Sequence, residues 1–321
     1  GDFLFRPQLA RRVRWNTNTD TPLPPEEPAG ENPPDGAVVD YYLKGTPSAA
    51  VTLDVLDSSG KLVRRFSSAD RPEPVNPKEL PIPTYWIRPP QALSGQAGFH
   101  RFVWDLHYPP PDAIEHEYPI AAVYRNTARQ PLGPWALPGD YTVRLTAGGK
   151  TQTQPLKIEM DPRVTASPDD LRSQFELSTR ITAAMHPGFE ALQQVKALRK
   201  DLAAVRERAA QSPAADAVAA LEKKAAALEE TSPRFGAGGP DEVAAPSFTR
   251  LNRSLATLLE IVDGADAKPT SRAAADVAET EKALAAQLAA WKEIQSTDVP
   301  ALNQELKKSS LPAVGVTSSS R

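Results

Sequence analysis

A chain of 321 residues with a net charge of −3 is long enough for about two domains and has no basic excess that would attract nucleic acid. The absence of cysteine excludes disulfides, thiolate metal sites and a cysteine nucleophile. No apolar run approaches the roughly 18 residues that a membrane-spanning helix needs. The sequence starts at Gly1 without an initiator methionine or a signal-peptide pattern, so we expect a piece of a longer chain.

Residues 1–36 are predicted to form an extended arm. The stretch 16–36 is polar and rich in proline, which favours an extended conformation over a packed element. The arm also contains the basic run Arg11 to Trp15, which is too short to indicate nucleic-acid binding. We expect a solvated edge or a salt-bridged strand at this run.

Residues 37–163 are predicted to form an immunoglobulin-like antiparallel β-sandwich. Hydrophobic residues alternate with other residues in short runs, as is typical of strands. The runs begin at Val39, Val51, Leu62, Phe102, Tyr141 and Leu156. Gly148 and Gly149 predict a hairpin turn between the last two runs. Six strands in about 125 residues fit this fold, and Trp104 is expected to fill the centre of its core.

Two long insertions, residues 68–97 and 107–137, interrupt these strands. Both combine prolines with aromatic residues, a composition that gives stiff, amphipathic surfaces. The insertions are predicted either to dock a partner or to fold back over the edges of the sandwich, with sugar stacking as a further alternative. The candidate binding residues are Tyr85, Trp86, Tyr108, Tyr118, Tyr124 and Trp135.

Residues 164–310 are predicted to form an antiparallel, up-and-down helical bundle. Ser167 and Pro168 indicate a helix start. Apolar residues then recur every three or four positions from Leu171 to Val205. Because Pro187 lies inside this stripe, we expect a kink or a short break there.

Three further helices and a short fifth are predicted to complete the bundle. The second and third are separated by a glycine-rich loop at Phe235–Pro240, and the fifth covers Asp298 to Lys308. A flexible tail is expected at residues 311–321. The first apolar stripe contains no histidine and no Glu-x-x-His pair, so no cofactor is expected.

The sequence contains no recognisable catalytic signature. It lacks a Gly-x-Ser-x-Gly elbow and a phosphate-binding loop. Only the run Glu115-His116-Glu117, with His107 upstream, is similar to a set of metal ligands. This run lies in a proline-rich insertion and not on rigid elements, so no metal site is predicted.

A glycosidase would need two carboxylates that face each other across a cleft. Asp40 and Asp54 are expected on the outward face of their strands, and Asp105 is expected to bind nearby backbone or arginine. An enzyme fragment that uses Asp105, Glu115 or Glu117 stays open as an alternative.

Five runs point to a known family. They are Arg14–Pro25, Asn32–Ala37, Phe102–Leu106, Gly133–Leu145 and Met160–Arg163. Together they resemble the C-terminal region of bacterial exported sortilin-like (VPS10-like) β-propeller proteins, often labelled BNR-repeat glycosyl hydrolases. The propeller of that family, with its Asp-box repeats, has no counterpart in these residues, so none of its catalytic residues can be placed here. The sandwich alone also resembles the Ig-like domain of flagellar hook-capping proteins.

The resemblance implies a non-catalytic C-terminal docking module of a secreted or periplasmic protein. Its expected partner is a β-propeller domain of the same or a companion polypeptide, and the helical bundle would engage other subunits. Neither nucleic acid nor a membrane span is expected. A carbohydrate-binding module and a fragment of a glycoside hydrolase remain the alternatives.

Overall fold

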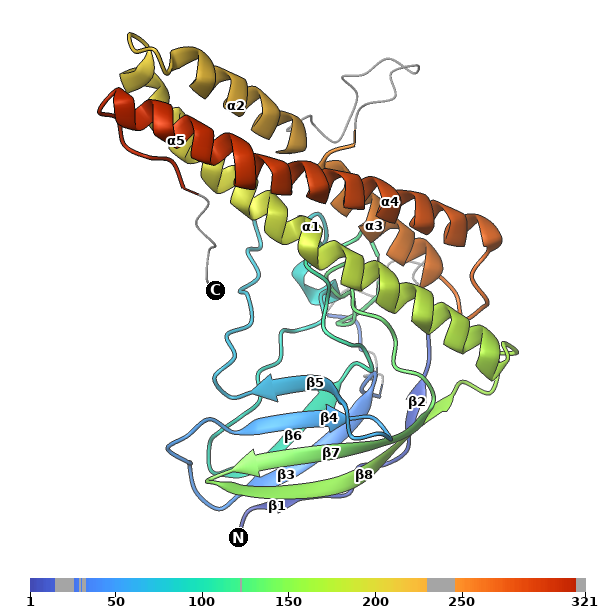
Figure 1. The fold of residues 1–321 in the computed structure, drawn as a ribbon. Coiled ribbons are helices and arrows are strands. Elements are labelled where there is room, and N and C mark those ends of the chain that lie inside the picture. The colour runs from blue at the N-terminus through green and yellow to red at the C-terminus, as the bar shows by residue number, and fades with distance from the viewer. Residues whose placement is uncertain (15–25, 29, 31–32, 122, 230–245, 316–321) are drawn as a thin grey trace. The chain divides into compact units, whose positions relative to one another are not determined.

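The computed structural model describes residues 1–14, 26–28, 30, 33–121, 123–229 and 246–315. The resembling run from Trp15 to Pro25, the glycine-rich loop Phe235–Pro240 and the last six residues of the tail lie outside these ranges. A β region comes first and a helical region follows, so the chain is α+β with separate modules, as predicted (Figure 1).

The described residues form two compact units. The β unit comprises Gly1–Pro110, His116–Glu176 and Asp263–Lys268. The helical unit comprises Pro111–Glu115, Leu177–Val262 and the chain from Pro269 onward.

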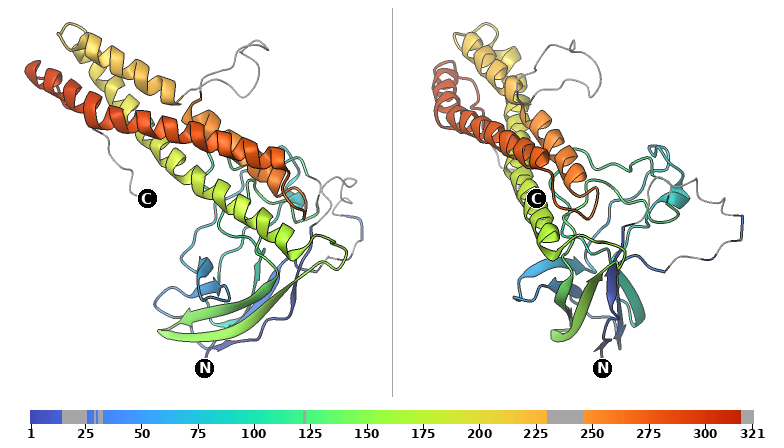
Figure 2. Two further views of the ribbon diagram at one scale, coloured as in Figure 1. Left: turned by 45° about the vertical axis from the view of Figure 1, so that its right-hand side comes forward. Right: turned by 90° about the vertical axis from the view of Figure 1, so that its right-hand side faces the viewer.

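Two sheets make up the β region. Their strands are β1 (Phe3–Leu4), β2 (Ala10–Arg12), β3 (Ala37–Leu43), β4 (Thr52–Leu56), β5 (Leu62–Ser67), β6 (Gly98–Trp104), β7 (Gly139–Ala147) and β8 (Lys150–Met160). One sheet has the order β1-β3-β6, and the other has the order β2-β8-β7-β4-β5. The strands β7 and β8 curve along their length (Figure 2). The six runs predicted from alternation correspond to β3 to β8.

The core of the β region follows the predicted alternation. Val39 of β3, Leu53 of β4 and Val143 of β7 are completely buried. Trp104 is also completely buried, and its Nε1 donates a hydrogen bond to the His107 carbonyl oxygen at 2.9 Å. The prediction that Trp104 fills the core is confirmed.

The strand β1 was not predicted, and β2 overlaps the start of the basic run, for which a salt-bridged strand was one of two expectations. Both strands are too short for a period of two to be visible, and other strands hold them. Gln152 Oε1 accepts a hydrogen bond from the Leu4 amide at 3.0 Å, and Gln154 Nε2 donates to the Leu4 carbonyl at 3.1 Å. β2 pairs with β8 in parallel, whereas the other strand pairs are antiparallel.

Asp54 faces away from this core, as predicted, but it is not exposed. Its side chain is only 2% exposed because Arg65 and Arg144, its cross-strand neighbours on β5 and β7, cover it. Alternation in the sequence predicts to which face of the sheet a side chain points. It does not predict whether long neighbouring side chains, such as those of arginine, will cover that side chain.

The helical region contains α1 (Pro168–Ala209), α2 (Ala215–Glu229), α3 (Phe248–Val262), α4 (Ser271–Glu293) and α5 (Val299–Lys308). A single π-helical turn, Ile294–Asp298, joins α4 to α5. Ser167 caps α1, since its Oγ accepts a hydrogen bond from the Asp170 amide at 3.1 Å. No described helix has the length and apolar character needed to cross a membrane.

A kink or a short break was expected at Pro187. The helix α1 continues through this proline, so there is no break. Met185 and Leu192, on either side of the proline, are both completely buried, so packing holds the helix on both sides. A Cβ on Gly188 would lie only 3.0 Å from Leu284 Cδ1 of α4, so the glycine allows the two helices to approach closely.

The loop between α3 and α4 contributes residues 263–268 to the β unit. Asp266 Oδ1 lies 2.5 Å from Nη2 of Arg12 and 2.9 Å from Nε of Arg14. Arg12 is only 1% exposed, and its Nη1 donates to the Ala136 carbonyl at 3.1 Å. The basic run is therefore salt-bridged, which was one of the two expectations for it.

Residues 111–115 of the second insertion belong in turn to the helical unit. Asn252 of α3 donates to the Asp112 carbonyl and accepts from the Ile114 amide, each at 2.9 Å. Arg253 Nη2 donates to Glu115 at 2.7 Å. Each unit thus includes a segment from the other part of the sequence.

Candidate functional site

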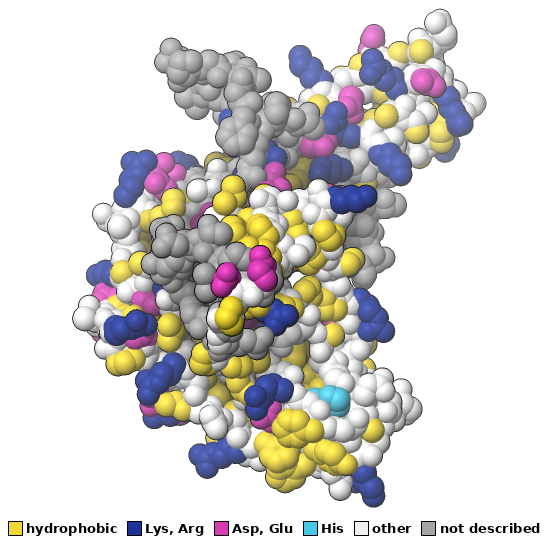
Figure 3. Space-filling view, turned by 180° about the vertical axis from the view of Figure 1, so that it is seen from behind, with side chains coloured by type: hydrophobic (Ala, Val, Ile, Leu, Met, Phe, Trp, Pro, Cys, Tyr) yellow, Lys and Arg dark blue, Asp and Glu magenta, His cyan; other side chains and the backbone are white. Residues whose placement is uncertain are grey.

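The three-stranded sheet carries an exposed aromatic face made of Phe3, Phe5, Tyr42 and Phe99. Their exposed fractions are 50%, 39%, 40% and 59%. Tyr42 on β3 is in register with Phe3 on β1 and with Phe99 on β6. The ring centroids of Phe3 and Phe5 are 4.8 Å apart, and those of Phe5 and Phe99 are 5.6 Å apart. Figure 3 shows hydrophobic side chains gathered at the lower end of the molecule in this view.

An ion pair lies beside this aromatic face. Arg101 donates from Nε and Nη2 to the two carboxylate oxygens of Asp40 at 2.8 and 2.9 Å. Asp40 and Arg101 are paired in the register of β3 and β6, two residues from the pair of Tyr42 and Phe99. The face therefore combines an aromatic centre with a polar border.

Sequence analysis missed this surface, although a signal was available. Phe3 and Phe5 alternate near the start of the chain, and Tyr42 and Phe99 occupy outward positions of strands whose inward positions were predicted correctly. Aromatic residues at outward positions of two strands are the pattern that could have identified it.

Two of the predicted binding residues, Tyr108 and Trp135, are partly buried and pack against the core of the β unit. Trp135 stacks near His107, with ring centroids 4.0 Å apart, and the guanidinium carbons of Arg12 and Arg14 each lie 5.1 Å from its ring centre. Tyr108 packs on Phe175 with a centroid distance of 5.2 Å.

The other four predicted binding residues lie in or beside a small cluster formed by the insertions. Tyr118 is buried with Ile82 and Ile87, and Trp86 packs on them. Tyr85 contacts Trp86 and Tyr124, with centroid distances of 6.2 and 6.4 Å. Tyr124 is 38% exposed, whereas Tyr85 and Trp86 are partly buried.

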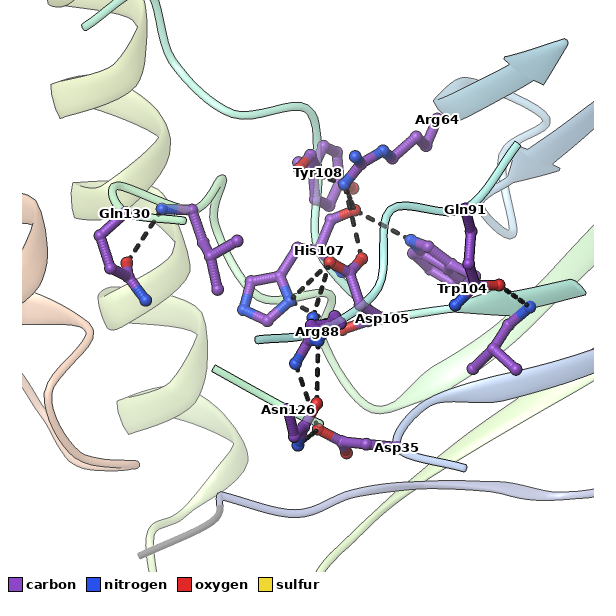
Figure 4. Close-up of polar contacts among 12 residues, drawn as sticks. Asp35, Arg64, Arg88, Gln91, Trp104, Asp105, His107, Tyr108, Asn126 and Gln130 are labelled. Atoms are coloured by element: carbon purple, nitrogen blue, oxygen red, sulfur yellow. Dashed lines mark hydrogen bonds and ion pairs between the residues drawn. The ribbon is translucent and has the colours of Figure 1, made fainter. Parts of the chain in front are cut away.

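A polar network at the end of β6 ties the insertions to the β region (Figure 4). Asp105 accepts from Nη1 of Arg64 at 3.5 Å and from Nη1 of Arg88 at 3.3 Å. Arg88 Nε also donates to Asn126 Oδ1 at 2.8 Å, and Asn126 Nδ2 donates to Asp35 at 2.9 Å. The prediction that Asp105 binds arginine is confirmed.

Electrostatics keep Asp105 ionised and His107 neutral. Burial opposes ionisation of Asp105, but the nearby positive groups, including Arg64 and Arg88, outweigh it and lower its pKa. Burial lowers the pKa of His107 to about 4 against the attraction of Asp105. Nδ1 of His107 donates to the Asp105 carbonyl at 2.7 Å, so the buried Nε2 is the unprotonated nitrogen. This Nε2 has no hydrogen-bond partner among the described residues.

A pocket of about 470 Å³ opens beside this network between the two insertions. Its charged lining side chains are Arg64, Glu73, Arg88, Asp105 and Arg129. The pocket also contains His116 of the run that was considered for metal binding. Within the described ranges, no three His, Asp or Glu side chains come together in a way that could hold a metal ion.

The remaining candidate carboxylates and histidines are engaged elsewhere. Glu115 belongs to the helical unit, where it pairs with Arg253, and Glu117 pairs through its backbone with Gln130. His100 lies against Tyr41, and Nδ1 of His186 is 2.6 Å from the Asp112 carboxylate.

No model of a known protein family matches the chain, and comparison with curated proteins found no relative. The resemblance to sortilin-like propeller proteins therefore stays a prediction from the sequence runs.

Proposed function

We propose that this chain is a non-catalytic docking module that binds a sortilin-like β-propeller, either in the same polypeptide or as a companion subunit. The observation that carries the proposal is the exposed aromatic face of Phe3, Phe5, Tyr42 and Phe99. The family resemblance supplies the identity of the partner and a secreted or periplasmic location.

The chemistry of the aromatic face favours a protein partner. A soluble protein rarely leaves several neighbouring aromatic side chains in water, and large exposed apolar patches mark interaction sites. Aromatic residues are enriched in the centre of protein interfaces, and polar groups form the rim. The ion pair of Asp40 and Arg101 fits such a rim.

The proposal also assigns an immunoglobulin-like sandwich to the β region and an up-and-down bundle to the helical region. The two sheets enclose a common core around Trp104, which supports an immunoglobulin-like sandwich. Contacts between α3 and α4 and between α2 and α5 support an up-and-down bundle. In this proposal the bundle engages further subunits.

The state of the candidate acid supports a non-catalytic role. Asp105 is held ionised by Arg64 and Arg88, which makes it a poor general acid. Sugar stacking has less support, because Tyr118 is buried, and Trp135 is partly buried with His107 and two arginines against its ring.

Binding between separately prepared partners tests the proposal. The chain and a sortilin-like propeller are mixed, and association is measured by calorimetry and size-exclusion chromatography. The double variant Phe3→Ser/Phe99→Ser is expected to weaken association at least about tenfold, since loss of a hot-spot side chain at the centre of an interface costs about 2 kcal/mol or more, and about 1.4 kcal/mol is a factor of ten.

Leu62→Ser provides the matched control, because Leu62 is 44% exposed but lies on β5 of the other sheet. It is expected to bind like the unaltered chain. No association with the propeller, or equal loss in the control and the double variant, would contradict the proposed docking face.

A further inference from the structure

The pocket between the insertions has walls suited to a flat apolar group. Prolines and aromatic rings form much of its lining. They are Phe66, Pro72, Pro89, Pro90, Phe102, Pro110, Tyr118 and Pro131. Its volume of about 470 Å³ lies within the range of small-molecule sites.

The charges at the pocket favour an anion. Within the lining, three arginines, Arg64, Arg88 and Arg129, outnumber two carboxylates, Asp105 and Glu73. A third carboxylate, Asp35, lies outside the lining, 3.5 Å from Arg88. The chain as a whole has a net charge of −3, so this local excess is not a general property of its surface.

Arg64 has the geometry to receive a carboxylate. Its hydrogen bonds to Asp105 and to the carbonyls of His107 and Tyr108 all use Nη1. Among the described residues, none of these bonds uses Nε or Nη2, so the edge that they form can make a bidentate contact. Its guanidinium carbon lies 5.1 Å from the ring centre of Phe66, so an aromatic surface adjoins the guanidinium group.

We infer that this pocket binds a small organic acid with one carboxylate and a flat apolar body. The carboxylate pairs with the Nε and Nη2 edge of Arg64, and the apolar body lies against the proline and aromatic walls. This site is separate from the proposed docking face, and it does not depend on a propeller partner.

Titration of the full chain with phenylacetate and with phenylacetamide tests the inference. The two probes share an apolar body, and only the first carries a charge. Phenylacetate is expected to bind at least about tenfold more tightly, and its affinity is expected to fall as salt is raised. In the isotope-labelled chain, the amide signals of Ala128 and Leu132, which line the pocket, are expected to shift.

Two variants locate the site. Arg64→Gln is expected to lower the affinity for phenylacetate about tenfold or more, since a charge-assisted bidentate contact is lost. Ala128→Trp is expected to abolish binding by filling the pocket while every charge is kept, which covers the case in which Arg64→Gln does not fold. Arg11→Gln removes an equal charge outside the pocket and is expected to leave binding unchanged.

Several results would overturn the inference. These are no binding of phenylacetate at millimolar concentration, equal affinity for the acid and the amide, or unaltered binding by folded Ala128→Trp. Signal shifts confined to residues away from the insertions would also overturn it. None of these results bears on association with a propeller.

Discussion

Asp266→Ala is expected to lower the free energy of unfolding of the β unit by about 3–5 kcal/mol. The side chains of Asp266 and Arg12 are 4% and 2% exposed, and the ion pair between them measures 2.5 Å. Without the carboxylate, Arg12 keeps only neutral acceptors, the Ala136 carbonyl and Gln174 Oε1. Burial lowers the pKa of Arg12 and Asp266 opposes that shift, so removal of Asp266 leaves a buried charge with little compensation.

Urea unfolding followed by tryptophan fluorescence measures this loss. Trp135 is a suitable reporter because the guanidinium carbons of Arg12 and Arg14 lie 5.1 Å from its ring centre. Urea is uncharged, so it does not screen the ion pair. Glu260→Ala serves as a control, since Glu260 is an exposed acid on α3.

The double variant Arg12→Met/Asp266→Leu completes the test. Apolar replacement of both partners removes the buried charge of Arg12, and Arg14, which also loses its contact with Asp266, is 22% exposed and can be hydrated. The stability of the double variant is therefore expected to approach that of the unaltered chain. The reasoning is refuted if Asp266→Ala costs less than about 1 kcal/mol, the value of an exposed ion pair. It is equally refuted if the double variant is as unstable as Asp266→Ala.

Two further predictions concern the β unit. Gly133→Ala is expected to destabilise it by about 1–3 kcal/mol in thermal unfolding, because a Cβ there would collide with the backbone carbonyl of Tyr108. Burial raises the pKa of Asp54, but hydrogen bonds from Arg65 and Arg144 outweigh it and hold the pKa below its usual value. The resulting stabilisation is expected to be complete above about pH 5 and to be lost as the pH falls through the lowered pKa.

Each of these predictions has a control. A Cβ on Gly45 would meet nothing within 4 Å, so Gly45→Ala is expected to leave the melting temperature nearly unchanged. Asp54→Asn is expected to flatten the acid limb of the stability profile, measured by urea unfolding between pH 3 and pH 7. Equal melting temperatures for both glycine variants, or the same acid limb in Asp54→Asn, would contradict the predictions.

The regular elements could be predicted from the sequence because their signals are local. Alternation located β3 to β8, and the inward residues Val39, Trp104 and Val143 are buried as predicted. The spacing of apolar residues located α1, where Ile181 and Leu198 are completely buried. In these strands and in this helix, one face is buried against a neighbouring layer, and that burial requires apolar residues at a regular spacing. The spacing in the sequence therefore predicts the element.

The surroundings of Arg12 and Trp135 could not be predicted, because they depend on residues that are distant in the sequence. The carboxylate that pairs with Arg12 comes from Asp266, 254 positions away in the sequence. Trp135 and Phe99 are both aromatic residues beside glycine or proline in sequence, but the first is partly buried against the core and the second is exposed. Composition identifies adhesive residues, and only the tertiary structure decides which of them face water.

Residues 111–115 belong to the helical unit and residues 263–268 belong to the β unit. The gene therefore cannot be cut at one point into two fragments that each encode a complete unit. A gene fragment that ends at residue 163 would encode Arg12 without its acidic partner. The complementary fragment would encode Asn252 without the backbone groups of Asp112 and Ile114 that it binds. Recombination at a single crossover would therefore produce two damaged products, and we expect the two parts of the sequence to be transmitted together.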